Sequence, residues 1–226
     1  MIKKLLLIFL LTYPQFSHSS VEVDFNIWLK KFKITAHEEG ISEETINNSL
    51  KNTKYLEQVI KYDRYQPEFF EDTKTYIKKR ATRSRMLKAK GLLIKNKKLF
   101  DEVEKEFKVE KELLLALWGI ETNFGKHVGK MDIISSLATL SFDKRRSEFF
   151  SKELIILLKL IDQKLIDADT LYGSGAGAFG NFQFMPSSIE NYAIDYDKNN
   201  KIELKQSLHD AVASAANYIN KIDWKY

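Results

Sequence analysis

The sequence of 226 residues has no cysteine, only three prolines and only nine glycines. Without cysteine the chain cannot form a disulfide, a thiolate zinc site or a cysteine nucleophile, and it has no cysteine to carry a lipid. Seven of the nine glycines lie between Gly119 and Gly180. Because glycine is concentrated where the backbone bends sharply or approaches a ligand closely, this interval is the first candidate for a functional site.

Strong charge of one sign is also missing. The 36 basic and 31 acidic residues leave a formal net charge of +5, and lysine and glutamate alternate over much of the chain. This pattern argues against nucleic acid as a partner, and a mildly basic surface suits a polymer that carries carboxylates. With 44% hydrophobic residues, the chain is long enough for one domain or two small lobes.

Residues 1–19 have the pattern of a secretory signal peptide. Lys3 and Lys4 form its charged region, residues 5–11 its apolar stretch and residues 17–19 a short run where cleavage is expected. The apolar stretch is too short to span a bilayer. We therefore expect a periplasmic protein without a stable membrane anchor; a buried N-terminal helix is the alternative interpretation.

Residues 20–100 predict an N-terminal helical lobe. Apolar residues recur at three- and four-residue spacing in residues 25–32, with lysines on the opposite side. Ser42 is expected to start a second helix and Pro67 a further one. Residues 74–99 form a basic amphipathic segment, which we interpret as a solvated face, with a binding surface as the alternative.

Residues 101–226 predict a second helical unit, so the expected fold class is all-α. A helix that ends near Glu121 is apolar almost all round, as a central core helix would be. Asp132 or Ser135 is expected to cap the next short helix. Three further helices are expected, over residues 147–166, 186–192 and 207–222.

The first candidate for chemistry is Glu121, in the segment LWGIETNFG at residues 117–125. Its carboxyl group closes the most apolar helix of the sequence, so neighbouring side chains should desolvate it and raise its pKa. A carboxyl group that stays protonated near neutral pH can act as a general acid toward a leaving oxygen. The alternative is a glutamate at a helix end that faces solvent.

Residues 172–188, YGSGAGAFGNFQFMPSS, form an uncharged segment that we call the glycine loop. Ser174, Asn181 and Gln183 offer neutral hydrogen-bond partners and three phenylalanines offer apolar faces, a combination suited to sugar rings. The segment lacks the Lys-Ser/Thr ending of a phosphate-binding loop. We interpret it as a sugar groove; a surface loop without a ligand is the alternative.

Residues 195–210, which we call the acidic loop, begin with oxygen-bearing side chains at alternate positions, as in an EF-hand calcium loop. Asn200 takes the place of the usual turn glycine, and asparagine tolerates the left-handed conformation. The candidate ligands are Asp195, Asp197, Asn199, the backbone carbonyl of Lys201, and Asp210. A polar loop without metal is the alternative.

Arg145 and Arg146 are a further candidate pair. Their forked guanidinium groups can bind carboxylates. A solvated helix start is the alternative interpretation.

Six blocks of the sequence, in order, strongly resemble the MltB-type lytic murein transglycosylases. The blocks are residues 63–69 (DRYQPEF), 118–125 (WGIETNFG), 137–140 (LATL), 145–150 (RRSEFF), 177–188 (GAFGNFQFMPSS) and 216–218 (ANY). Together they extend over most of the chain, so the resemblance is not confined to one motif.

This resemblance implies a lysozyme-like helical core with an N-terminal helical lobe. It implies cleavage of the β-1,4 bond between N-acetylmuramic acid and N-acetylglucosamine in peptidoglycan, without a cofactor. Glu121 matches the family glutamate, which protonates the glycosidic oxygen and then accepts the proton of the muramic C6 hydroxyl, leaving 1,6-anhydromuramic acid ends. One carboxylate suffices where the substrate's own acetamido group assists.

The resemblance also implies ligand contacts. Ser174, Gln183 and Tyr218 match residues that line the family's sugar groove, and the Arg145–Arg146 pair falls in another matched block. The acidic loop matches the family's calcium loop. Peptidoglycan glycan strands are therefore the expected partner, and a structural calcium ion is an expected ligand.

The chain ends at residues 224–226, whereas family members continue with a segment that adds a tyrosine and an asparagine to the site. We expect the chain to lack these two groups. Two alternatives to a catalyst follow: a peptidoglycan-binding protein without turnover, and an exported calcium-binding interaction module.

Overall fold

The computed structural model describes residues 17–65 and 71–224. The expected signal peptide, apart from residues 17–19, and the helix start expected at Pro67 lie outside these ranges. Within the described residues eleven α-helices make up nearly all of the regular structure, which confirms the expected all-α class. The helices are α1 (Ser17–Glu38), α2 (Glu43–Ser49), α3 (Glu57–Arg64), α4 (Thr73–Arg80), α5 (Arg83–Lys95), α6 (Lys97–Phe107), α7 (Lys111–Thr122), α8 (Ile133–Phe142), α9 (Ser147–Asp162), α10 (Pro186–Tyr192) and α11 (Leu208–Lys221).

A small antiparallel sheet, which the sequence did not predict, joins two short segments that flank α8 and α9. Strand β1 (Met131–Asp132) pairs with β2 (Tyr172–Gly173), so that Met131 lies opposite Gly173. A short 3₁₀ helix, η2 (Ala168–Thr170), leads into β2. Strands of two residues are too short to show an alternating pattern, which is why the sequence gives no signal for them.

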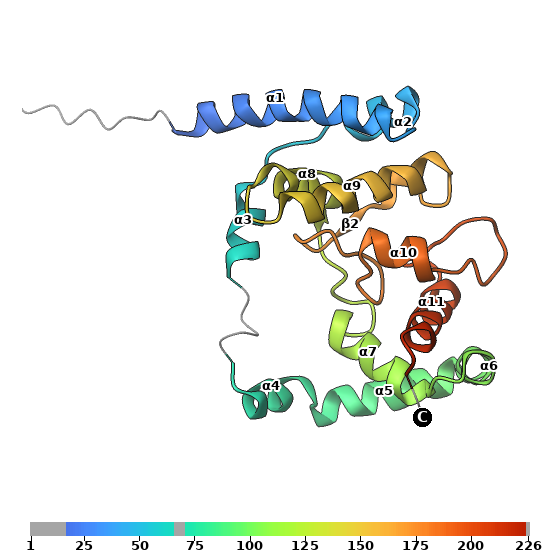
Figure 1. The fold of residues 1–226 in the computed structure, drawn as a ribbon. Helices are drawn as coiled ribbons and strands as arrows, with labels where there is room; N and C mark the ends of the chain where they lie inside the picture. The colour runs from blue at the N-terminus through green and yellow to red at the C-terminus, as the bar shows by residue number, and fades with distance from the viewer. Residues whose placement is uncertain (1–16, 66–70, 225–226) are drawn as a thin grey trace, which may run out of the picture.

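Figure 1 shows α1 and α2 above α8 and α9, with α5, α6 and α7 at the opposite end and α10 and α11 between. Helices α1 and α3 pack on α8, and α2 packs on α9, whereas α5 and α6 pack on α7. The helices before residue 100 thus contact both ends of the molecule. The domain boundary at residue 100 stays a prediction, and it falls within α6.

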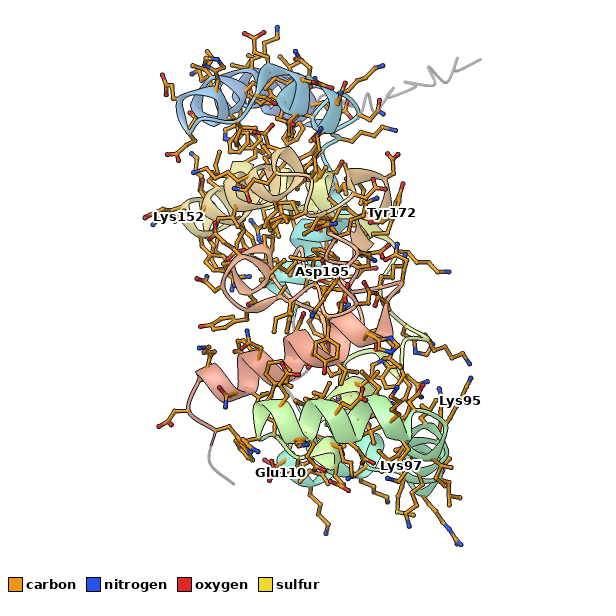
Figure 2. The ribbon with its side chains drawn as sticks, turned by 90° about the vertical axis from the view of Figure 1, so that its right-hand side faces the viewer. Lys95, Lys97, Glu110, Lys152, Tyr172 and Asp195 are labelled. Atoms are coloured by element: carbon orange, nitrogen blue, oxygen red, sulfur yellow. The ribbon has the colours of Figure 1, made fainter. Side chains whose placement is uncertain are left out.

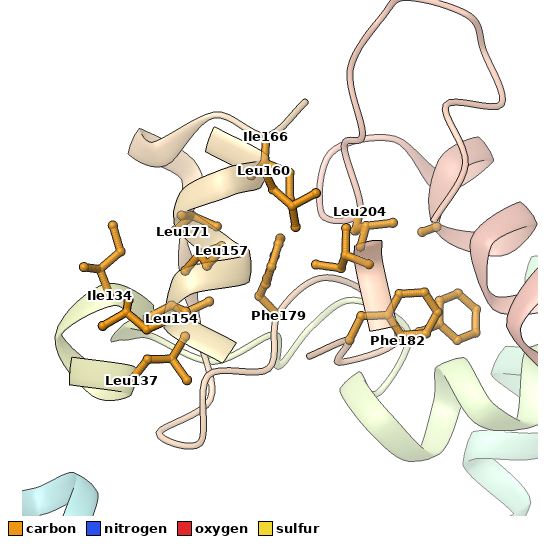
Figure 3. Close-up of a cluster of buried hydrophobic side chains, with 14 of the residues drawn as sticks. Ile134, Leu137, Leu154, Leu157, Leu160, Ile166, Leu171, Phe179, Phe182 and Leu204 are labelled. Atoms are coloured by element: carbon orange, nitrogen blue, oxygen red, sulfur yellow. The ribbon is translucent and has the colours of Figure 1, made fainter. Parts of the chain in front are cut away.

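The core is densest where α8 and α9 meet the glycine loop. Leu137, Leu154 and Leu157 are completely buried, and Phe179 of the glycine loop lies beside them (Figure 3). Leu204, which follows in the acidic loop, closes the cluster from the other side. Burial of each such side chain contributes about 1.5–3 kcal/mol, so the core holds both loops in place.

Local signals explain several helix starts. The Ser42 hydroxyl accepts a hydrogen bond from the Thr45 backbone N–H and caps α2, as expected. Asp132 caps α8 by accepting from the Ser135 N–H, which decides between the two expected caps. Pro186 begins α10, as predicted.

Two segments differ from what the sequence predicts: α9 is shorter, and the basic segment is divided between helices. Helix α9 stops at Asp162 because Lys164 adopts a left-handed conformation (φ 61°) and the Leu165 N–H turns back to the Leu160 carbonyl. The basic segment 74–99 is not continuous, because Thr82 caps a new helix, α5. No described helix is both long and apolar enough to cross a membrane.

Candidate active site

Glu121 lies in the last turn of α7, whose buried face includes Leu114, Leu115 and Trp118. The residue is exposed, yet partial desolvation by the surrounding protein raises the pKa of its carboxyl group above the ordinary value. Within residues 17–65 and 71–224, no side chain forms an ion pair or hydrogen bond with this carboxylate. Such a group holds its proton to a higher pH than a free glutamate, as a general acid must.

Helix α7 ends immediately after Glu121 for a local reason. Asn123 and Phe124 both have left-handed backbone angles, with φ of 52° and 60°. The Phe124 ring folds back to meet the Trp118 ring edge-on at 5.6 Å. The turn therefore leaves the Glu121 carboxyl group at the end of a well-packed helix and next to an abrupt change of chain direction.

The glycine loop is a fixed turn. The Ser174 backbone N–H donates to the Ala178 carbonyl at 2.8 Å, and the Ser174 hydroxyl accepts from the Ala178 N–H at 3.0 Å. At Gly177 φ is +92°, and a Cβ there would overlap the Leu137 side chain. Only glycine fits such a position, so the sequence of this turn reflects its close packing on α8.

The three phenylalanines of the glycine loop do not face a ligand. Phe179, Phe182 and Phe184 are exposed by only 4%, 8% and 8% and belong to the hydrophobic core. The expectation that they offer apolar faces to sugar rings is therefore wrong. The sequence could not separate the two roles, because an uncharged loop with aromatic residues can cover either a ligand or a core.

Ser174 and Gln183 belong to the glycine loop, and Tyr218 lies on α11. The Gln183 side-chain amide donates to the backbone carbonyls of Val128 at 3.2 Å and Gly180 at 3.0 Å. The Tyr218 ring of α11 lies 5.8 Å from Phe184. All three predicted residues are only partly buried. Their contact with sugar stays a prediction.

Asn181 joins the glycine loop to α7. Its side-chain carbonyl accepts from the Trp118 indole N–H at 2.9 Å, and its backbone carbonyl accepts from the Thr122 hydroxyl at 2.8 Å. Glu121 lies between these two residues of α7. These two hydrogen bonds thus join the end of α7 to the glycine loop, although the two segments are far apart in sequence.

Arg145 and Arg146 are both held by Asp63 of α3. Arg145 donates to the Asp63 carboxylate at 3.1 Å and to the Asp63 backbone carbonyl at 3.0 Å, and Arg146 pairs with the other carboxylate oxygen. The Asp63 side chain is 4% exposed, whereas those of the arginines are 50% and 39% exposed. The pair therefore ties α3 to the start of α9, and its role toward substrate stays a prediction.

The acidic loop gathers three carboxylates. One oxygen from each of Asp195, Asp197 and Asp210 lies within 4.8 Å of the others (the loop is marked by Asp195 in Figure 2). Asp210 is fully buried. Its burial is the main cause that raises the pKa of its carboxyl group, and the negative charge of the nearby Asp197 raises it further. The backbone N–H groups of Tyr196 and Glu203 donate to Asp210 and fold the loop around it.

Other members of the acidic loop order its turn. Asn200 has φ of 67°, the left-handed conformation expected for it in place of glycine. The Asn199 side-chain oxygen accepts from the Lys201 N–H at 2.9 Å, and its amide donates to Glu203. Carboxylate and amide oxygens are the kind of ligand that calcium prefers, and calcium binding by this loop stays a prediction.

A hollow of about 700 Å³ lies between α4, α5 and α7. Its walls include Ile77, Met86 and Ile120, and Arg80 also lines it. Glu121 is not among the lining residues, although Ile120 precedes it. Gly119 and Phe124 also line it, so the hollow reaches the turn of α7 that carries Glu121.

The mainly helical fold is that of solved lytic transglycosylases, which have a lysozyme-like helical core. Residues 24–226 match the family described as Transglycosylase SLT domain, and the chain belongs to that family.

Several relatives support this assignment. The chain is 42% identical over 117 residues to the membrane-bound lytic murein transglycosylase B of Escherichia coli strain K12, which covers 51% of this chain and 32% of that protein. SltB3 of Pseudomonas aeruginosa, in complex with NAG-NAM-pentapeptide, has a TM-score of 0.85 at 32% identity, covering 88% of this chain and 54% of that one. The E. coli lytic transglycosylase Slt35 in complex with calcium has a TM-score of 0.75 at 29% identity, covering 94% and 69%. The chain thus spans about a third and about half of the first two relatives.

Proposed function

We propose that the chain is a lytic transglycosylase that cleaves peptidoglycan between N-acetylmuramic acid and N-acetylglucosamine. The observation that carries this proposal is the position of Glu121, at the end of α7 and tied through Trp118 and Thr122 to the glycine loop. Membership of the transglycosylase family supports it, as does the NAG-NAM-pentapeptide held by the related SltB3.

In this reaction Glu121 acts first as an acid and then as a base. The carboxyl proton moves to the glycosidic oxygen as the bond from that oxygen to the muramic anomeric carbon breaks. The C6 hydroxyl oxygen of the same sugar then bonds to the anomeric carbon, and its proton returns to the Glu121 carboxylate. No water is consumed, and the product carries a 1,6-anhydro ring.

A single carboxylate is enough for these steps because the nucleophile belongs to the substrate. Residues 172–188 contain no aspartate or glutamate. The raised pKa of Glu121 supports the acid step, since a desolvated carboxyl group holds the proton that the leaving oxygen needs.

The groove is proposed to include Ser174 and Gln183 of the glycine loop and Tyr218 of α11, whose ring lies 5.8 Å from that of Phe184. Arg145 and Arg146 keep exposed portions while bound to Asp63, and these portions are proposed to meet carboxylates of the peptidoglycan. Both proposals rest on the family resemblance and on the exposure of these side chains.

The protein is proposed to work in the periplasm, where its substrate lies. The signal-like pattern of residues 1–19 supports this location. We also propose that the acidic loop binds calcium through Asp195, Asp197, Asn199, Lys201 and Asp210. When bound, calcium would neutralise the three converging carboxylates and order the loop; it takes no part in the proton transfers.

The decisive experiment is mass spectrometry of fragments released from purified sacculi by the mature chain. We expect 1,6-anhydromuropeptides from the wild type and none from Glu121→Gln, while Glu112→Gln on the same helix should retain activity. Product with reducing ends would indicate a hydrolase. Binding to sacculi without any released product would favour the non-catalytic alternative, and an active Glu121→Gln variant would refute the role of Glu121.

A further inference from the structure

Asn181 occupies an unusual position between three parts of the chain. It is a buried polar residue, only 6% exposed, within a loop that otherwise buries phenylalanines. On one side it receives hydrogen bonds from Trp118 and Thr122, the two residues that flank the Glu121 turn of α7. A buried amide is stable only when its groups are paired, so these contacts are strongly specified.

On its other side Asn181 contacts the acidic loop. Its side-chain amide donates to the carbonyls of Leu204 at 3.0 Å and Lys205 at 3.1 Å, and its backbone N–H donates to the Leu204 carbonyl at 2.8 Å. A Cβ on the preceding Gly180 would lie 2.7 Å from Leu204 Cβ, which shows how closely the two segments pack. The two segments are therefore held against each other by hydrogen bonds and by close packing.

The contact continues directly to the carboxylate cluster. Glu203, the residue before Leu204, donates its backbone N–H to Asp210 at 3.0 Å. Asp210 in turn shares the cluster with Asp195 and Asp197. A short path of hydrogen bonds and backbone thus leads from the carboxylates, through residues 203–205 and Asn181, to the end of α7.

We propose that Asn181 is a positioning residue for Glu121 and couples the end of α7 to the acidic loop. This inference rests on the proposed function of Glu121. Asn181 holds the Trp118 indole with its oxygen and the Leu204 and Lys205 carbonyls with its nitrogen, so one amide sets the distance between the two elements. A cation bound in the acidic loop orders residues 203–205. Because Asn181 is hydrogen-bonded both to these residues and to Trp118, this order extends to the turn that carries Glu121.

The physical basis is the sensitivity of proton transfer to geometry. A displacement of about 1 Å in a catalytic group can lower the rate about 100-fold. Because Trp118 and Thr122 lie one turn and one residue from Glu121, a change at Asn181 rotates or shifts that carboxyl group without touching it. We expect the ground-state contacts of the sugar with the proposed groove residues to be kept.

The first test separates positioning from folding through selective variants. Asn181→Ala removes all side-chain contacts, Trp118→Phe removes only the indole donor, and Thr122→Val removes a hydroxyl while Thr122→Ser retains it. Asn191→Ala is the matched control, because that amide donates only to the Ser187 carbonyl of its own helix. Circular dichroism establishes which variants are folded.

For the folded variants we expect kcat on sacculi to fall about 10- to 100-fold in Asn181→Ala and Trp118→Phe, with KM nearly unchanged. Thr122→Val should lower kcat to a similar extent, whereas Thr122→Ser should keep a kcat close to that of the wild type. Asn191→Ala should have the kcat of the wild type. Wild-type kcat in folded Asn181→Ala and Trp118→Phe would overturn the positioning role.

The second test uses no enzymatic activity, so it still decides the coupling if no product is ever released. The indole N–H resonance of Trp118, assigned through Trp118→Phe, is followed by NMR while calcium chloride is added. We expect it to shift in the wild type and to stay in place in Asn181→Ala, whereas the Trp28 indole in α1 should not respond. A Trp118 resonance that ignores saturating calcium in the wild type would overturn the coupling.

Discussion

At the scale of single residues, the site depends on how polar groups are placed within apolar surroundings. Glu121 is exposed and yet partly desolvated, because it completes a helix whose other side packs into the core. Asp63 is the opposite case, because its carboxylate is buried and forms ion pairs with Arg145 and Arg146. The Glu121 carboxyl group thus has a raised pKa, whereas Asp63 serves to hold two elements together.

The raised pKa of Glu121 predicts a pH dependence of stability. Below the unfolded-state value of about 4.5 the carboxyl group is protonated in both states, and its favourable contribution to folding is complete. As the pH rises through the higher folded-state pKa, that contribution is lost. Wild type should therefore lose stability relative to Glu121→Gln as the pH is raised from 4 to 7.

Urea unfolding of both proteins at several pH values measures this difference. Glu112→Gln, an exposed change on the same helix, serves as the control and should show no comparable trend. In activity assays the same ionisation should appear as a fall in kcat/KM with rising pH, centred above 4.5. A stability difference that is flat over this range would contradict the desolvation of Glu121.

At the scale of elements, helix ends are held by specific side chains from other helices. Glu153 of α9 is 3% exposed, and its two carboxylate oxygens accept from the Ser187 hydroxyl at 2.6 Å and the Ser187 N–H at 2.9 Å. Ser187 lies in the first turn of α10, where a carboxylate is favoured by the helix dipole. Glu153 thus attaches α10, which continues from the glycine loop, to the core.

Removing this attachment should destabilise the fold. Glu153→Ala leaves Ser187 without its partner and should lower the free energy of unfolding by about 2–3 kcal/mol, and Glu153→Gln should cost less because one acceptor remains. Glu148→Gln, in the same helix, removes only a surface pair with Lys152 and should change stability by less than about 0.5 kcal/mol. Urea denaturation measures all three; equal effects of Glu153→Ala and Glu148→Gln would contradict the assignment.

At the scale of the whole molecule, segments that are distant in sequence meet at the glycine loop. The glycine loop packs on α8 through Gly177, on α7 through Asn181 and on the acidic loop through Leu204. Helices α1 to α3 cover one end of this arrangement, and α5 and α6 support the other (Figure 1). Order in the acidic loop should therefore stabilise the whole fold.

Calcium should raise the thermal stability of the chain. At a free concentration 100 times the dissociation constant, binding to the folded state alone adds about 2.7 kcal/mol, which corresponds to a rise in Tm of roughly 5–10 °C for a chain of this size. Thermal unfolding followed by circular dichroism, in calcium and in chelator, measures the shift. Asp197→Asn should reduce it, whereas the exposed Asp169→Asn should respond like the wild type; an unchanged Tm in the wild type would refute the proposed site.

The sequence by itself determined what depends on neighbours along the chain. Ser42, Asp132 and Pro186 start helices because capping groups and proline act within a single turn. The raised pKa of Glu121 was expected from the apolar residues of its own helix, and the left-handed Asn200 from the chemistry of asparagine. These features could be predicted because their causes lie within a few residues.

Only the tertiary structure decided which groups of the candidate site hold the fold together. Asn181 meets Trp118 across 63 residues of sequence, and Asp63 meets Arg145 across 82. The phenylalanines of the glycine loop were expected to face a sugar and are instead buried. Hydrophobic burial and hydrogen bonding between residues so far apart in sequence depend on how the helices pack. The periodic pattern of the sequence does not specify that packing.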